Sequence, residues 1–243
     1  PELFDEGLEE YPQSYLFHFN RAIALIELKR YTEAVEGLQT SIRYNPKYYA
    51  SHYRLGKLCA EHGDITKAAL ALNMAMLINA TEENNIHIIA QLETLYEGSV
   101  ENTINNLKYR ESEQFDDIDE KILDKIAEND RYKVKVKLPF SFIKTNHLIF
   151  EELRYSEESE GFWNQTYVPI YKEIMAEEQF ANLSYFQCLV VDDHRTQRVI
   201  EKNKKKITAF IPWMRELLTE SFNARTVWDG NRYVKNHLNH DGS

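Results

Sequence analysis

The sequence predicts an all-α fold, in which antiparallel helix pairs stack into an α-solenoid and a C-terminal helical module follows. Three observations support this prediction. Apolar residues recur at i, i+3, i+4 and i+7 along much of the 243-residue chain, which is the period of an amphipathic helix. Residues 15–46 repeat the pattern of residues 49–80 at an offset of 34 residues. Only eight Gly and six Pro are present, too few for a loop-rich or all-β protein.

Each of the two repeated units is expected to contain two helices, over residues 15–28 and 32–44 and then over 49–61 and 65–78. Asn45-Pro46 ends the first unit, and Gly63-Asp64 separates the helices of the second. Small residues stand at matching positions, Ala22 with Gly56 and Ala34 with Ala68. Such residues allow two helix axes to approach to about 8–10 Å. One helix pair cannot bury both of its faces, so the units must stack.

This pattern resembles the tetratricopeptide repeat, which has a 34-residue period and small residues at its eighth and twentieth positions. Departures are His18 and His52, where the family prefers Trp, and Ala80, where it prefers Pro. The resemblance predicts repeats over residues 1–98: a half repeat (1–14), two full repeats (15–48 and 49–82) and a closing helix (84–97). It is strong over residues 3–80 and fades by about residue 98.

The remainder is divided into a polar linker (99–115), a helical module (116–222) and a tail (223–243) that could begin a β-rich segment. Within the module we expect a helix from Asp116 with Ile118, Ile122, Leu123 and Ile126 on one face. An extended connection (132–140) and helices over 141–154, 161–176, 180–191, 194–206 and 207–222 follow, with Pro212 kinking or restarting the last. Trp163, Tyr167 and Tyr171 are interpreted as a packed core face. This region resembles helical regions of bacterial tetratricopeptide proteins, some of them exported and without a settled activity.

Composition and motifs disfavour several functions. The net charge of −10 argues against a general role on nucleic acid, because phosphates attract clustered Lys and Arg; the run from Lys202 to Lys206 is interpreted as a solvated helix face. No apolar run approaches the roughly 20 residues that span a bilayer. No phosphate-binding loop, GxSxG or HExxH motif is present, and His237, His240 and Asp241 in the tail are not expected to bind a metal. We therefore predict no catalytic, cofactor-binding or metal-binding residues.

The sequence does not identify the cellular compartment of the protein. Cys59 and Cys188 lie in helical patterns and are interpreted as buried free thiols, which do not identify a compartment. The chain begins "PELFDEG" without Met, which suggests a fragment of a longer protein. Export into a bacterial periplasm or cell envelope and a cytoplasmic location are both left as possibilities.

The resemblance implies that the first helix of each repeat lines a concave groove. The groove-facing residues would be Leu16, Phe19, Asn20, Ile23 and Glu27 in one repeat, and Ala50, Tyr53, Arg54, Lys57 and Glu61 in the next. Some family members clamp a peptide's terminal carboxylate with Asn and basic residues. Asn20 and Arg54 match two of those positions, but Ala50 replaces the companion Lys.

We therefore predict a protein–protein interaction scaffold that binds a peptide or protein segment in this groove without catalysis. The predicted site comprises Leu16, Phe19, Asn20, Ile23, Tyr53, Arg54 and Lys57. Two alternatives stay open: a hydrolase or transferase with its site in the C-terminal module, and a structural spacer whose groove is filled by the chain's own later helices. The partner's identity and the oligomeric state are not predicted.

Overall fold

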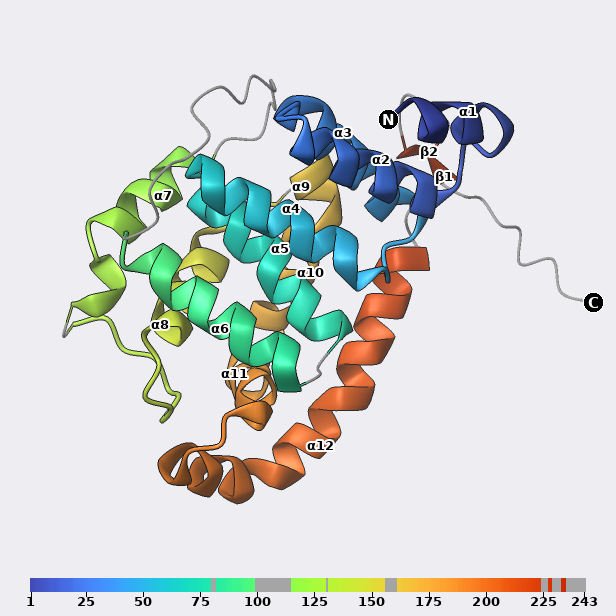
Figure 1. Cartoon of the computed structure of the whole chain (residues 1–243). Coiled ribbons are helices and arrows are strands. Elements are labelled where there is room, and N and C mark those ends of the chain that lie inside the picture. The colour runs from blue at the N-terminus through green and yellow to red at the C-terminus, as the bar shows by residue number, and fades with distance from the viewer. Residues whose placement is uncertain are drawn as a thin grey trace, which may run out of the picture.

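The computed structural model is all-α apart from two short strands (Figure 1), as the helical periodicity predicts. It describes residues 1–79, 82–98, 115–129, 131–155, 161–223, 227–228 and 233–234. The helices of the N-terminal part are α1 (Glu2–Glu10), α2 (Tyr15–Glu27), α3 (Tyr31–Tyr44), α4 (Tyr49–His62), α5 (Ile65–Ile78) and α6 (Glu82–Tyr96). The later elements are α7 (Asp116–Leu123), η1 (Ile126–Glu128), α8 (Ser141–Glu152), α9 (Phe162–Thr166), α10 (Val168–Ala176), α11 (Phe180–Gln187), η2 (Cys188–Val190), α12 (His194–Asn223), β1 (Val227–Trp228) and β2 (Tyr233–Val234).

Helices α2 to α6 match the predicted helices to within two residues at each end. Ser14 begins α2, and its hydroxyl accepts a hydrogen bond from the backbone N–H of Phe17, which satisfies one of the free donors at a helix start. Gly63 ends α4 with φ of +98°, a left-handed conformation that favours glycine. Local sequence signals thus set these helix boundaries.

Small residues stand where paired helices cross, as predicted. Ala22, Ala34 and Ala68 are fully buried. A Cβ atom on Gly56 would lie 2.8 Å from Cγ of Leu72 in the paired helix α5, a distance too short for two carbon atoms. The predicted register of the helix pairs therefore agrees with the packing.

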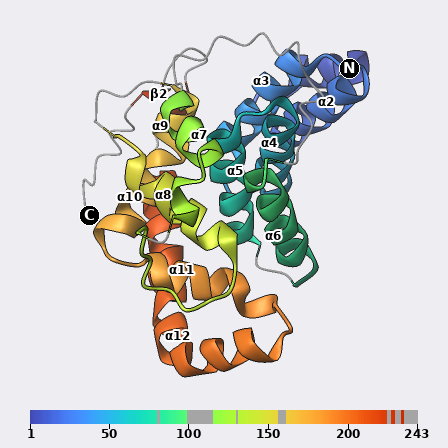
Figure 2. The ribbon, with the colours of Figure 1, turned by 90° about the vertical axis from the view of Figure 1, so that its left-hand side faces the viewer.

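The helices form three layers, which Figure 2 shows from the side. The first helices of successive units, α2, α4 and α6, form one outer layer. Their partners α3 and α5 form the middle layer, and α7 to α10 lie on the other side of it. Helix α12 is not straight and runs along the edge of this assembly (Figure 1).

Helix α5 is enclosed on all sides, with every residue from Ile65 to Leu77 buried. One hydrophobic core includes residues of the repeats and of α7 to α12. Trp163, Tyr167 and Tyr171 belong to it and are fully buried, as predicted for a packed core face. The hydroxyl of Tyr171 donates to the carbonyl of Leu70 in α5 at 2.7 Å, so polar contacts also join the two parts.

Buried amides form a second polar connection across the same interface. Asn73 of α5 and Asn146 of α8 are paired by two hydrogen bonds, of 3.0 and 2.8 Å. Gln187 donates to Asn73 at 2.7 Å, and the Tyr96 hydroxyl donates to Asn146 at 2.6 Å. Because buried polar groups are costly without partners, this network favours one specific docking of the later helices.

Two helix predictions in the C-terminal part are wrong. The predicted helix 161–176 is interrupted at Tyr167, because Pro169 has no N–H for the carbonyl of Gln165 and instead occupies the first turn of α10. Residues 194–222, predicted as two helices, form the single helix α12, and Pro212 lies within it. A continuous buried face with Ile207, Phe210, Met214 and Leu218 stabilises the helix on both sides of this proline.

The face predicted for the helix at Asp116 is only partly correct. Ile118 and Ile122 are buried, whereas Leu123 is 59% exposed and Ile126 is 41% exposed. The reason is that α7 ends at Leu123 and the chain then turns at Lys125, which has φ of +55°.

The connection before α8 is extended, as predicted. Its apolar residues Tyr132, Val134, Val136, Leu138 and Phe140 pack against the core. The predicted linker lies outside the described residues except for Phe115. In the tail, β1 and β2 form an antiparallel pair.

Candidate functional site

The predicted groove residues belong to α2 and α4, two helices of the outer layer, which lie on the side of the molecule away from α8 and α10 (Figure 2). Four of them are exposed: Leu16, Asn20, Arg54 and Lys57. The other three, Phe19, Ile23 and Tyr53, are half-buried. The structure thus brings all seven residues to two neighbouring helices, and we call this surface the first-helix face.

Aromatic rings support the first-helix face from below. The Phe19 ring lies edge-on to Tyr48, with 5.2 Å between centroids, and the Tyr15 ring is 5.0 Å from that of Tyr48, also in a T-shaped arrangement. Tyr53 is stacked on Tyr49 at 5.8 Å. The orientation of Phe19 and Tyr53 is therefore set by rings at the junction between the two repeats, which the sequence prediction did not include.

Helix α6 adds two residues that the prediction missed. Nε2 of Gln91 lies 3.2 Å from the Tyr53 hydroxyl and 3.1 Å from Nε2 of His87. The His87 ring lies 6.3 Å from that of Tyr53. The 34-residue offset could have identified both residues, because Phe19, Tyr53 and His87 are equally spaced, as are Ile23, Lys57 and Gln91. Helix α6, predicted as a closing helix, therefore continues the 34-residue spacing of α2 and α4 on this face.

The positive charge on this face comes from Arg54 and Lys57. Nζ of Lys57 lies 3.9 Å from a carboxylate oxygen of Glu61, one helical turn away. Arg54 is exposed and makes no ion pair with any residue that the structure describes. Asn20, the other residue of the possible carboxylate clamp, is exposed on α2. These side chains are available to a ligand, since an exposed ion pair of this length contributes little to stability.

Helices α4 and α6 enclose a hollow of about 270 Å³ on this face. Its lining residues are Lys57, Ala60, Glu61, Leu72, His87, Ala90, Gln91 and Thr94. A larger cleft of about 530 Å³ lies between α12 and the C-terminal end of α5. It is lined by Lys47, Leu77, Ile78, Phe186, Ile211, Met214, Arg215, Leu218, Thr219 and Phe222, and thus by neither carboxylate nor imidazole groups.

The C-terminal part brings one Tyr, His and Glu together: the Tyr132 hydroxyl lies 2.7 Å from Nδ1 of His147 and donates to Glu151 at 3.0 Å. None of these three residues lines either of the two cavities described above. Cys59 and Cys188 are buried and form no disulfide, as predicted, and burial raises the pKa of Cys188 to about 12. Such a thiol is a poor nucleophile at neutral pH. Among the described residues, no group of three His, Cys, Asp or Glu side chains could hold a metal ion; His237, His240 and Asp241 lie outside them. Nor is any described helix both long and apolar enough to span a membrane.

Comparison with known proteins agrees with the repeat pattern. A model of the tetratricopeptide repeat matches residues 2–39 and 34–80. The tetratricopeptide repeat and J domain-containing co-chaperone DNJ1 of Cryptococcus neoformans var. grubii is 30% identical over 69 residues. The match covers 28% of this chain and 13% of the co-chaperone, so it is limited to a small part of that relative. No solved structure matches the chain significantly.

Proposed function

Residues 2–80 of this chain belong to the tetratricopeptide repeat family, and from this premise we propose that the chain binds a protein segment on its first-helix face. The segment would be an extended or helical peptide that carries acidic groups. Phe19 and Tyr53 would contact its apolar part, and Arg54 and Lys57 would receive its carboxylates. The chain would act as an interaction scaffold without a catalytic step of its own.

The observation that carries this proposal is that the later helices pack on the opposite side of the repeats. The contacts that join the two parts start from the second-helix layer, as with Leu70 and Asn73 of α5, and from the side of α6 that contacts α8, as with Tyr96. His52 of α4 also faces that interior and contacts Tyr167. The first-helix face therefore keeps its exposed residues, which favours a groove for a partner over a groove filled by the chain's own α7 to α12.

The chemistry of the face supports an acidic ligand. Aromatic and Arg side chains contribute a large share of the binding energy in protein interfaces. The chain has a net charge of −10, and Arg54 and Lys57 provide the cationic contacts of this face, which also carries Glu27 and Glu61. Complementary charge of this kind favours the correct partner and speeds its association.

A selection from a random peptide display library against the chain tests the proposal. We expect the selected peptides to be enriched in Asp and Glu beside apolar residues. The double variant Arg54→Glu/Lys57→Glu should weaken their binding by roughly 2–4 kcal/mol in isothermal titration calorimetry, because reversed charges add repulsion to the lost pairing. Circular dichroism must first show that the variant is folded.

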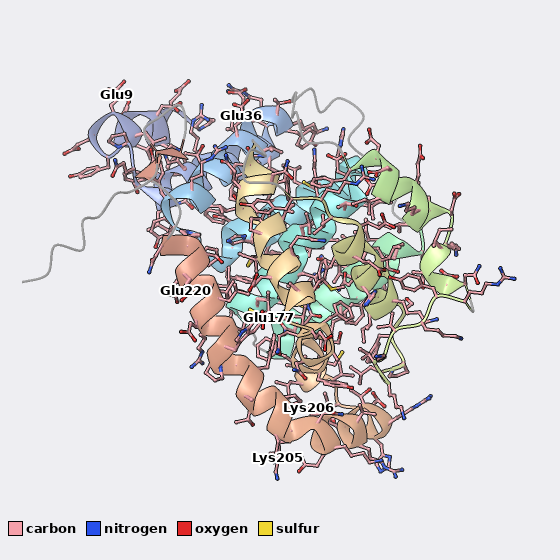
Figure 3. All side chains as sticks on the ribbon, turned by 180° about the vertical axis from the view of Figure 1, so that it is seen from behind. Glu9, Glu36, Glu177, Lys205, Lys206 and Glu220 are labelled. Carbon is pink, nitrogen blue, oxygen red and sulfur yellow. The ribbon has the colours of Figure 1, made fainter. Side chains whose placement is uncertain are left out.

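A matched control is Lys205→Glu/Lys206→Glu, which changes the net charge by the same amount. Both lysines are exposed on α12, and Figure 3 shows them at the opposite end of the molecule from Glu36 of the repeats. Selected peptides should bind this control as they bind the wild-type chain. If the folded Arg54/Lys57 variant binds with unchanged affinity at low salt, the first-helix face is not the site and a spacer role is favoured.

A further inference from the structure

The hollow between α4 and α6 has an apolar base and a polar rim. Leu72 of α5 forms the base and is almost fully buried, while Ala60 and Ala90 form opposite walls. The rim carries the polar side chains of Lys57, Glu61, His87, Gln91 and Thr94. A ligand group that fills this hollow would thus be apolar at its tip and would meet polar groups where it leaves the surface.

The first repeat provides an internal comparison for this hollow. At an offset of 34 residues, Ile26 in α2 corresponds to Ala60 in α4, and Ile23 corresponds to Lys57. Ile26 is half-buried and packs against the core. At this position the first repeat has the branched side chain of Ile26, whereas the second repeat has only the methyl group of Ala60. The smaller side chain leaves space between α4 and α6.

The opposite wall is open for a different reason. Ala90 corresponds to Ala22 and Gly56, and each of those two is buried against the second helix of its own repeat. A Cβ on Gly37 of α3 would lie 3.1 Å from Cβ of Ala22, and a Cβ on Gly56 would lie 2.8 Å from Cγ of Leu72. Ala90, in contrast, is exposed in the described part of the chain. It therefore forms an apolar, accessible wall.

We propose that this hollow receives one large apolar side chain, such as Trp or Leu, from an acidic peptide bound on the first-helix face. This inference rests on the proposed function and names the residue class that the partner must present. A volume of about 270 Å³ is slightly smaller than most small-molecule pockets, which measure about 300–1,000 Å³, and it suits a single anchoring side chain.

Polar residues at the rim can bind the peptide residues that flank the anchoring side chain. Lys57 can pair with a carboxylate, since its present ion pair with Glu61 is exposed and 3.9 Å long. Oε1 of Gln91 is buried without a hydrogen-bond partner among the described residues. An unsatisfied buried acceptor is unfavourable, so a peptide N–H that reached this oxygen after a small side-chain rotation would be stabilised.

Two tripeptide probes separate the anchor from the charge: acetyl-Glu-Trp-Glu-amide and acetyl-Glu-Ala-Glu-amide, which carry the same carboxylates. Their binding would be followed by NMR of labelled methyl groups in the full chain. We expect the Trp probe to shift the methyl signals of Leu72, Ala60 and Ala90 in a saturable way. The Ala probe should bind at least about 10-fold more weakly, because burying a large apolar side chain supplies that factor.

Two variants fill the hollow from opposite walls. Ala60→Ile copies the residue that the first repeat carries at the same position, and Thr94→Leu adds an apolar group from the exposed side of α6. Each should remove most of the 10-fold preference for the Trp probe. Ala209→Ile, at an exposed position of α12, is the matched control and should leave that preference unchanged. If one filling variant fails to fold, the other still decides the question.

The outcomes distinguish this inference from the proposed function. Equal binding of the two probes, or an unchanged preference in a folded filling variant, overturns the anchor. So does the absence of any shift at Leu72, Ala60 and Ala90. In each case a loss of peptide binding in Arg54→Glu/Lys57→Glu would still support the first-helix face as a binding site. Unchanged peptide binding in that charge variant would instead overturn the proposed function itself.

Discussion

The carboxylate of Asp119 in α7 caps the N-terminus of α5, a helix that begins 54 residues earlier in the chain. Oδ1 accepts a hydrogen bond from the backbone N–H of Thr66 at 2.8 Å, and Oδ2 accepts one from Ile65 at 3.2 Å. Asp64, the residue that directly precedes α5, makes no side-chain cap. Asp119, a residue of the C-terminal part, therefore satisfies backbone N–H groups at the start of α5 that have no partner within the helix. The same hydrogen bonds cap α5 and attach α7 to the repeats.

This cap predicts a pH dependence of stability. Burial raises the pKa of Asp119 from 3.8 to about 6, although the hydrogen bonds from Thr66 act in the opposite direction. Between about pH 4 and pH 6 the folded chain then holds a proton that the unfolded chain has released. The free energy of unfolding must therefore fall as pH rises through this window. A pKa difference of about 2 corresponds to at most about 3 kcal/mol.

The measurement is urea-induced unfolding at several pH values for the wild-type chain and for Asp119→Asn. An amide keeps one oxygen that can accept from the Thr66 N–H, and it does not titrate. The wild-type unfolding free energy, relative to that of the variant, should therefore decrease from pH 4 to pH 6. A difference that is constant or increases over this range would show that the carboxyl does not keep its proton in the folded state.

His52 and Tyr167 form a second contact between the repeats and the later helices. Nε2 of His52 lies 2.9 Å from the Pro46 carbonyl, which can only accept, so this nitrogen carries the proton. Nδ1 then accepts from the Tyr167 hydroxyl at 2.8 Å. Tyr167→Phe should lower the free energy of unfolding by about 1–3 kcal/mol, because it removes the hydroxyl that donates to a buried acceptor.

The matched control for that substitution is Tyr185→Phe, which removes a hydroxyl from a residue that is also buried. No hydrogen bond of the Tyr185 hydroxyl is found among the described residues, so its removal should change stability by less than about 0.5 kcal/mol. Chemical unfolding monitored by circular dichroism compares the two variants. Equal effects of the two substitutions would mean that the His52 contact contributes nothing specific.

The repeats could be predicted because their signals are local and recur at a fixed period. Small residues such as Ala22 and Ala68 mark helix crossings in any unit, and Gly63 marks a helix end, so pattern alone gave α2 to α6. The same period would have placed His87 and Gln91 on the first-helix face, had it been extended into α6. The missed part of the candidate site was thus present in the sequence.

The docking of the later helices could not be predicted in this way. Asn73 and Asn146 are 73 residues apart, and no periodicity connects an amide in one helix with an amide in another. Whether a proline interrupts a helix also depends on packing: Pro169 coincides with a break, whereas Pro212 lies within α12. A helix continues through a proline when a continuous buried face offsets the lost hydrogen bond, and that face belongs to the tertiary structure.

Helix crossing in the second repeat gives a further stability prediction. Gly56→Ala would ordinarily stabilise a helix by about 0.5–1 kcal/mol. Here the added Cβ would lie 2.8 Å from Cγ of Leu72 and 3.1 Å from its backbone nitrogen, and neither atom is the flexible end of a side chain. Overpacking of this kind costs about 1–3 kcal/mol, so we expect net destabilisation. A raised thermal midpoint in the variant would contradict the close crossing.

The paired second helix gives an independent test of the same register. Ala34 and Ala68 are both fully buried, so Ala34→Leu and Ala68→Leu should each lower the free energy of unfolding by about 1–3 kcal/mol. Ala209→Leu, at an exposed position of α12, is the control and should have little effect. Wild-type thermal midpoints in both buried variants would refute the repeat register.

Limited proteolysis tests how the two parts of the chain are held together. The sequence between about residues 98 and 116 is polar and weakly patterned, and such segments are preferred sites of cleavage. We expect a first cut there, identified by mass spectrometry of the fragments. Because one hydrophobic core and the Asp119 cap join the parts, the two fragments should still elute together from a size-exclusion column. Fragments that separate without denaturant would show that the shared core does not keep the two parts associated. A chain that resists cleavage between residues 98 and 116 would indicate one continuous solenoid.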